Sequence, residues 1–167
     1  MALRPDEIYI LEKPVWTHED FERMGWHDVT IYAITFHPEA CEFVLDMDYI
    51  FAWVDPEPPS PGYSFWISPA TLVFQDVTDF KARVEEPLGL QIMDISRKDP
   101  RPPKNAAYLP SQVEWTWTID LLQGEIEFSS IGYCQHTRRK PVRVLSQQLS
   151  LEERGRISFD RPKILDE

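Results

Sequence analysis

The strongest structural signal lies at residues 26–55, which read WHDVTIYAITFHPEACEFVLDMDYIFAWVD. From residue 41 to residue 54, apolar side chains occupy every second position. Side chains of a β-strand point alternately to opposite faces, so this alternation predicts a long strand with one buried face. The predicted buried face consists of Cys41, Phe43, Leu45, Met47, Tyr49, Phe51 and Trp53.

A second strand is expected just before this one. Residues 29–36 are rich in β-branched and aromatic side chains, and residues 37–40 read HPEA. Pro38 has no N–H group to donate to a sheet, so the chain is expected to turn there and return antiparallel. Residues 26–55 therefore predict a β-hairpin at the centre of the fold.

The rest of the chain predicts more strands and little helix. Alternating or β-rich runs occupy residues 63–77, 113–121 and 125–135. One short helix is expected near residues 17–24, because Thr17 can cap its start and Gly25 suits its end. No strand–helix–strand alternation is visible. The sequence thus predicts a mainly β fold, an antiparallel sandwich or partly closed barrel of about seven to eight strands with one short N-terminal helix.

A chain of 167 residues is most simply one domain. We divide the predicted single domain, residues 1–167, into an N-terminal arm with the short helix (1–25), a β domain (26–151) and a charged tail (152–167) that frays. Two cysteines are too few for a disulfide framework, and no apolar run is long enough to cross a membrane. These features predict a cytoplasmic protein.

The net charge of −11 is distributed unevenly. Residues 1–95 hold 18 acidic and 5 basic side chains, whereas residues 96–167 hold 10 acidic and 12 basic ones. Phosphate binding needs concentrated Lys and Arg, so nucleic acid is not expected as a partner. A surface of one sign attracts partners of the opposite sign, and it also keeps a protein soluble.

Two pairs of residues could carry chemistry. Asp46 and Asp48 lie two apart on the predicted strand, so both carboxylates share its outward face. His27 and Asp28 begin the neighbouring strand and could add ligands for a divalent cation. The alternative is that Asp46 and Asp48 are solvated positions of a half-exposed strand. The sequence contains no complete catalytic or cofactor motif, so no metal and no cofactor are expected.

Three motifs carry a resemblance to a known family: W-H-D at residue 26, D-x-D-Y-I-F-x-W at residue 46 and F-W-x-x-P-A-T-L-V-F at residue 65. They resemble a family of small bacterial proteins of unknown function, over about residues 26–151. His27-Asp28 with the following hairpin is also similar to immunity proteins that neutralise bacterial toxins. The matching positions are Trp26, His27, Asp28, Asp46, Asp48, Tyr49, Trp53, Phe65, Trp66 and Pro69.

We therefore expect a non-enzymatic, acidic binding protein of the immunity type, whose partner is a basic toxin or another protein. The alternatives are a small-molecule-binding β-barrel and a metal-dependent hydrolase that uses Asp46, Asp48 and His27. The partner is expected to meet an acidic strand face and a few aromatic anchors. The predicted partner-binding residues are Glu42, Asp46, Asp48, Tyr63, Phe65 and Trp66.

Overall fold

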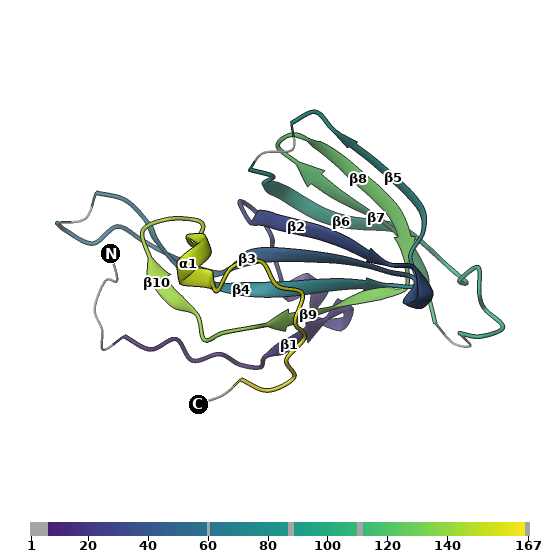
Figure 1. Ribbon diagram of the computed structural model, residues 1–167, viewed down its shortest axis with the longest axis horizontal. Helices are drawn as coiled ribbons and strands as arrows, with labels where there is room; N and C mark the ends of the chain where they lie inside the picture. Colours follow the sequence, from purple (N-terminus) through teal and green to yellow (C-terminus); the bar gives the residue numbers. More distant parts are fainter. Residues whose placement is uncertain (1–6, 60, 87–88, 110–111, 166–167) are drawn as a thin grey trace.

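The computed structural model describes residues 7–59, 61–86, 89–109 and 112–165, so the ends of the predicted arm and tail lie outside the described residues. Within these ranges the chain forms two antiparallel sheets of six and four strands (Figure 1). The prediction of a mainly β, two-sheet fold is confirmed. The two sheets do not close into a complete barrel, because their edge strands are joined only by one short bridge.

The six-stranded sheet, called sheet A below, has the strand order β1-β9-β4-β3-β2, with β10 paired to β4 as well. Its strands are β1 (Val15–Thr17), β2 (Thr30–His37), β3 (Glu42–Val54), β4 (Ser64–Gln75), β9 (Gly132–Thr137) and β10 (Val142–Val144). The predicted hairpin is its centre. β2 and β3 pair antiparallel around the short 3₁₀ helix η2 (Pro38–Ala40), and Cys41 completes the turn with a left-handed backbone (φ 53°).

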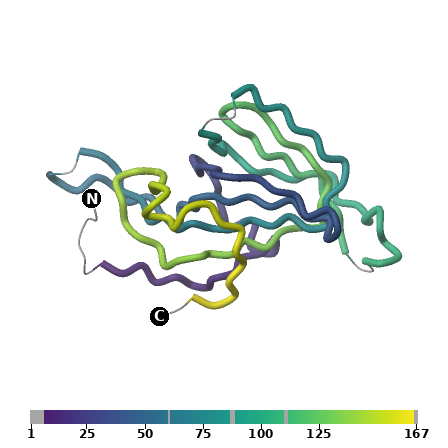
Figure 2. The backbone as a smooth tube through the Cα atoms, viewed as in Figure 1, coloured from purple at the N-terminus to yellow at the C-terminus, as the bar shows by residue number. Residues whose placement is uncertain are grey.

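The four-stranded sheet, sheet B, has the order β5-β8-β7-β6. Its strands are β5 (Thr78–Val84), β6 (Ile92–Arg101), β7 (Glu114–Leu121) and β8 (Gly124–Ser130). The two sheets meet where the start of β6 reaches the start of β2: the Ile92 amide donates to the Val29 carbonyl at 2.8 Å, and Thr30 pairs with Gln91. Figure 2 shows the same arrangement as a continuous tube.

Two bends join the sheets a second time. β4 passes into β5 just after Gln75, and β8 passes into β9 at Ile131, so a run predicted as one strand over 125–135 serves both sheets. The bends lie against each other, because the Ser130 hydroxyl donates to the Gln75 carbonyl at 2.6 Å. These bends, together with the short strands β1 and β10, bring the number of strands in the described residues to ten, compared with the seven to eight predicted.

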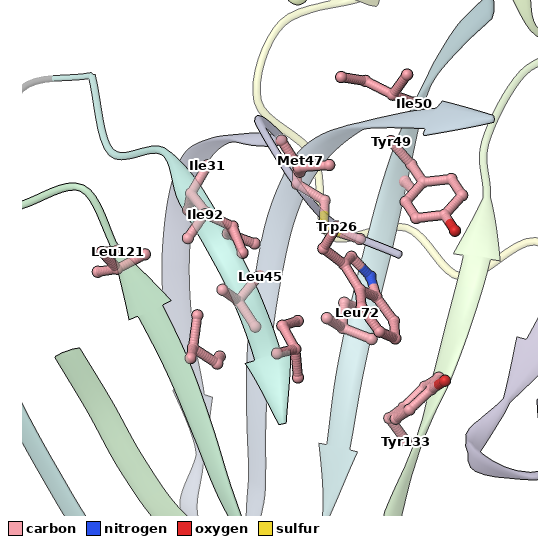
Figure 3. Close-up of a cluster of buried hydrophobic side chains, with 14 of the residues drawn as sticks. Trp26, Ile31, Leu45, Met47, Tyr49, Ile50, Leu72, Ile92, Leu121 and Tyr133 are labelled. Atoms are coloured by element: carbon pink, nitrogen blue, oxygen red, sulfur yellow. The ribbon is translucent and has the colours of Figure 1, made fainter. Parts of the chain in front are cut away.

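The core lies between the sheets and is rich in aromatic rings (Figure 3). Trp117 from β7 is fully buried and packs edge-on against Phe74 of β4, with ring centroids 5.3 Å apart. Trp26 packs between Tyr49 and Tyr133. The predicted inward face of β3 is confirmed over its first half, where these side chains are buried: Phe43, Leu45, Met47 and Tyr49.

The predicted N-terminal helix exists as a 3₁₀ helix, η1 (His18–Arg23), and Thr17 and Asp20 form the capping box at its start. The prediction that the charged tail frays is wrong for the part of the tail that the structure describes. Residues 151–154 form a short α-helix, α1 (Leu151–Arg154), and the chain after it packs across sheet A (Figure 1).

Candidate functional site

Asp46 and Asp48 share one face of β3 as predicted, but that face is not exposed. Both residues are completely buried, with no solvent-accessible surface. The expectation of an outward acidic face at these two positions is therefore wrong. The cause is a segment far along the sequence, which covers the face of sheet A that points away from sheet B.

We call this segment, residues 149–162, the C-terminal strap. It is tied to four strands of sheet A, β2, β3, β4 and β9, by backbone groups. The Leu149 amide donates to Asp48 Oδ2 of β3 at 2.7 Å. The Thr71 hydroxyl of β4 donates to the Asp160 carbonyl at 2.6 Å, and the Pro162 carbonyl lies 3.1 Å from a ring nitrogen of His136 in β9.

Arg154 of α1 is the centre of the strap. Its side chain is completely buried and bonds to both aspartates: Nε to Asp48 Oδ1 at 3.0 Å, and Nη1 and Nη2 to the two oxygens of Asp46 at 2.8 and 2.7 Å. Its guanidinium also lies 3.9 Å from the ring centroid of Tyr32. Arg138 adds a 2.7 Å bond to Asp46, so two guanidinium groups balance two carboxylates.

Burial works against every charge in this network. It raises the pKa of Asp48, opposed by hydrogen bonds from the Leu149 amide and Arg154. It lowers the pKa of Arg138 in spite of its bond to Asp46. For Arg154 burial also acts downward, but the bonds to Asp46 and Asp48 prevail and its pKa lies above the ordinary value. All these oxygens face guanidinium or amide groups, so the network supports the fold, and its carboxylates are closed to a partner.

His27 and Asp28 lie elsewhere. A ring nitrogen of the exposed His27 lies 3.0 Å from the Met93 carbonyl, and the Asp28 carboxylate accepts from Gln91 and Gln147 at 3.2 and 2.9 Å. His27 therefore does not join Asp46 and Asp48 in one cluster. Among the described residues, no three His, Cys, Asp or Glu side chains are placed to hold a metal ion.

Only one of the three predicted aromatic anchors is exposed. Tyr63 is 47% exposed, whereas Phe65 is buried at 6% and Trp66 is half-buried beneath Tyr9. The prediction of Phe65 as an exposed anchor is therefore wrong, because Phe65 belongs to the core. Trp53, predicted as core, is 46% exposed and contacts Tyr63.

Trp53, Tyr63 and His27 form a surface group that we call the ring cluster. The Trp53 ring lies edge-on to Tyr63 at 5.9 Å and stacks with His27 at 6.4 Å between centroids. Phe65 supports Trp53 from the core side at 5.1 Å. Trp53 leaves the predicted inward face because of a β-bulge between Ile50 and Ala52, after which it pairs with Phe65 of β4. The alternation in the sequence carries no signal of this shift.

The uneven charge along the sequence is partly balanced by ion pairs within the chain. Acidic residues of the first 95 positions pair with cations supplied by the remainder: Asp46 and Asp48 with Arg154, Glu42 with Arg161, Glu7 with Arg143, Asp79 with Lys104 and Glu22 with Arg97. Glu42 accepts two hydrogen bonds from Arg161, at 2.8 and 2.9 Å, so it is not a bare acidic position either.

A scan against models of protein families finds no match to this chain, and a search of curated proteins finds none either. Among solved structures, the chain is similar to a crystal structure of an uncharacterized protein from Neisseria gonorrhoeae. The TM-score is 0.40 and the sequence identity 12%, over 72% of this chain and 95% of that chain. A similarity of this size supports no conclusion about function. None of the helices in the described residues is long and apolar enough to span a membrane.

Proposed function

We propose that this protein is a non-enzymatic binding protein that docks a basic protein partner through the ring cluster. The observation that carries the proposal is the exposure of two large rings side by side: Trp53 and Tyr63 are each nearly half exposed and in contact. Trp and Tyr dominate the binding energy of protein interfaces, because they bury large areas and lose little conformational freedom.

The charge around the ring cluster favours a basic partner. Residues 24–80 contain nine acidic side chains and no Lys or Arg. Four of the nine, Glu42, Asp46, Asp48 and Asp79, pair with cations from elsewhere in the chain. Asp55 and Glu57 are exposed on the loop that begins two residues after Trp53. The docking face therefore moves from the covered strand to the end of the β3–β4 hairpin.

A basic bacterial toxin is the partner class that we propose, following the resemblance of the hairpin to immunity proteins. In such an inhibitor the aromatic anchors supply most of the affinity, and the acidic loop steers the partner's Lys and Arg. The covered carboxylates at Asp46 and Asp48 support a binding role over the hydrolase alternative, since they are not accessible to a substrate.

The first test is capture from the source cell with the full chain as bait, compared with a Trp53→Ala, Tyr63→Ala double variant. Tyr108→Ala is the matched control, because Tyr108 is another exposed aromatic residue, 87% exposed, in the separate loop after β6. We expect a basic protein to be captured by the wild type and the control, with at least about thirtyfold weaker binding to the double variant. Capture that is equal for all three baits would contradict the proposed face.

The second test is the association rate of the captured protein at two salt concentrations. At about 0.5 M salt the Debye length is roughly 4 Å, so charges on the surface loop are screened. Association should slow by at least about tenfold between low salt and this concentration. Neutralising Asp55 and Glu57 together should slow it in the same direction at low salt. An association rate that does not depend on salt would refute the role of charge.

A further inference from the structure

A cleft of about 310 Å³ opens beside sheet A, away from both the ring cluster and the strap. The N-terminal segment, η1 and the middle of β3 surround it. Its volume is at the lower end of the range for small-molecule sites, so it suits a compact ligand. The lining residues that matter here are Tyr9, Glu12, Trp16, Arg23, Tyr49 and Phe51.

Aromatic rings form the walls of this cleft. Phe51 lies 5.6 Å from Tyr9 with the ring planes inclined by 50°, and 4.9 Å from Tyr49 with the planes inclined by 85°. Because the three rings stand at large angles to one another, they make a concave wall rather than a flat stack. Trp16 of β1 adds a fourth ring to the lining.

Cations of the chain itself lie against the Trp16 ring of this cleft. The Arg23 guanidinium lies 5.2 Å and the Lys13 ammonium 4.7 Å from the Trp16 ring centroid. Both cations are held by carboxylates: Arg23 bonds to Glu12 at 3.2 and 3.3 Å, and Lys13 bonds to Asp20 at 2.7 Å. The electron-rich ring faces favour cations and disfavour anions, whereas these ion pairs add no net charge.

The engaged carboxylates also restrict the kind of cation. A primary ammonium or guanidinium group needs hydrogen-bond acceptors, and the chain's own Arg23 and Lys13 already occupy the oxygens of Glu12 and Asp20. A quaternary ammonium group, whose nitrogen carries four carbon substituents, donates no hydrogen bond. It can bind through ring faces alone. The wall of Tyr9, Tyr49 and Phe51 supplies these rings, and the charge of Glu12 in the lining is balanced by Arg23.

We propose that this cleft binds a small organic cation with a quaternary ammonium head, the class to which choline belongs. The proposal does not depend on the proposed protein partner, since the two sites share no residue. Three rings contact the head, and Arg23 stays in its pair with Glu12 at the rim.

The test is a titration of the full chain with choline and with 3,3-dimethyl-1-butanol, a neutral molecule of the same shape. The readout is the NMR signal of the Trp16 indole N–H, which donates to the Lys13 carbonyl at 2.9 Å in the cleft wall. We expect a saturable shift with choline, and binding of the neutral molecule weaker by about fivefold or more. Equal affinity for both molecules, or no shift of the Trp16 signal, would overturn the proposal.

Two variants locate the site. Glu12→Gln leaves the Arg23 guanidinium without its carboxylate beside the cleft, so its positive charge should weaken choline binding by about threefold and leave the neutral molecule unaffected. Glu19→Gln is the matched control, because Glu19 is an exposed carboxylate of η1 outside the lining, and it should change neither affinity. Tyr9→Leu should weaken choline binding without affecting partner capture through the ring cluster. Choline binding that is unchanged in both Glu12→Gln and Tyr9→Leu would place it elsewhere and refute the assignment.

Discussion

The two halves of β3 have the same alternating pattern and different surroundings. From Phe43 to Ile50 every side chain is buried on both faces, whereas Trp53 and Asp55 at the far end face solvent. The first half lies between the core and the C-terminal strap, and the second half extends past both. A register shift between Ile50 and Ala52 separates the halves, so Trp53 pairs with Phe65 of β4 and leaves the inner face of Tyr49. Alternation in the sequence therefore defines which residues share a face only up to this bulge, and the covering segment decides whether a face is exposed to solvent.

The two halves of β3 also differ in the role of their charged and aromatic side chains. Under the strap, Asp46 and Asp48 are held by Arg154 in a closed network that contributes to the fold. At the open end, rings and carboxylates stand together without such cover. The closed half is structural, and the open half is where we propose that a partner binds.

The largest expected effect is in the closed half. Arg154→Met leaves the carboxylates of Asp46 and Asp48 buried without their main partner, so the free energy of unfolding should fall by about 3–5 kcal/mol. Urea unfolding followed by circular dichroism measures it. Arg156→Met, at an exposed position of the same strap, is the control and should stay within about 0.5 kcal/mol of the wild type. A loss below about 1 kcal/mol for Arg154→Met would mean that the strap does not seal the face.

A smaller effect is expected in the open half. Trp53 is 46% exposed and keeps edge contacts with Phe65 and Tyr63, so Trp53→Ala should lower the free energy of unfolding by only about 1 kcal/mol. The same urea experiment measures it. A loss as large as that of Arg154→Met would show that Trp53 is a core residue, and the ring cluster would then lose its role as a surface.

The smallest effect concerns Glu42, where β3 begins. The hydrogen bond from Arg161 lowers the pKa of Glu42 below its ordinary value of 4.5. A carboxyl group with a lowered pKa in the folded state stabilises the protein above the unfolded-state pKa, and this contribution disappears as the pH falls through the folded-state pKa. Glu42→Gln should therefore cost about 0.5 kcal/mol at pH 7, and the difference from wild type should shrink to zero in acid.

Urea unfolding at a series of pH values tests this prediction. Glu39→Gln, an exposed neighbour on η2, is the control and should show no such pH-dependent difference. A Glu42→Gln penalty that is constant from pH 7 to acid would contradict a contribution from the charged pair with Arg161.

The elements that could be predicted from the sequence were those with local signals. The alternation around Phe43 and Leu45, the proline turn at Pro38 and the capping box at Thr17 each depend on neighbours in the chain, and all three are present in the structure. One local signal points to an element that the sequence analysis does not predict: Ser150 and Glu153 form a capping box, and Gly155 ends α1 with a left-handed backbone (φ 78°), in the region assigned to the end of the β domain and the charged tail.

The long-range pairings could not be predicted in this way. Nothing near Asp48 in the sequence indicates that Arg154, 106 residues further on, fills the space above it. A D-x-D pair on a strand has the same appearance whether it is solvated, binds a metal ion or is matched by buried arginine. The exposure of Trp53 is equally hidden from the alternating pattern, because it follows from the bulge between Ile50 and Ala52.

The strap also imposes an order on how the protein folds during its synthesis. Arg154 is synthesised 106 residues after Asp48, and a ribosome adds about 5–20 residues per second, so the aspartates wait for roughly 5–20 s before their partner exists. During that interval the outer face of β3 must stay hydrated, because two unpaired carboxylates cannot be buried at acceptable cost. The inner core can be completed only once Tyr133 has been made, and sheet A can be sealed only later, after the helix that carries Arg154 has left the ribosome.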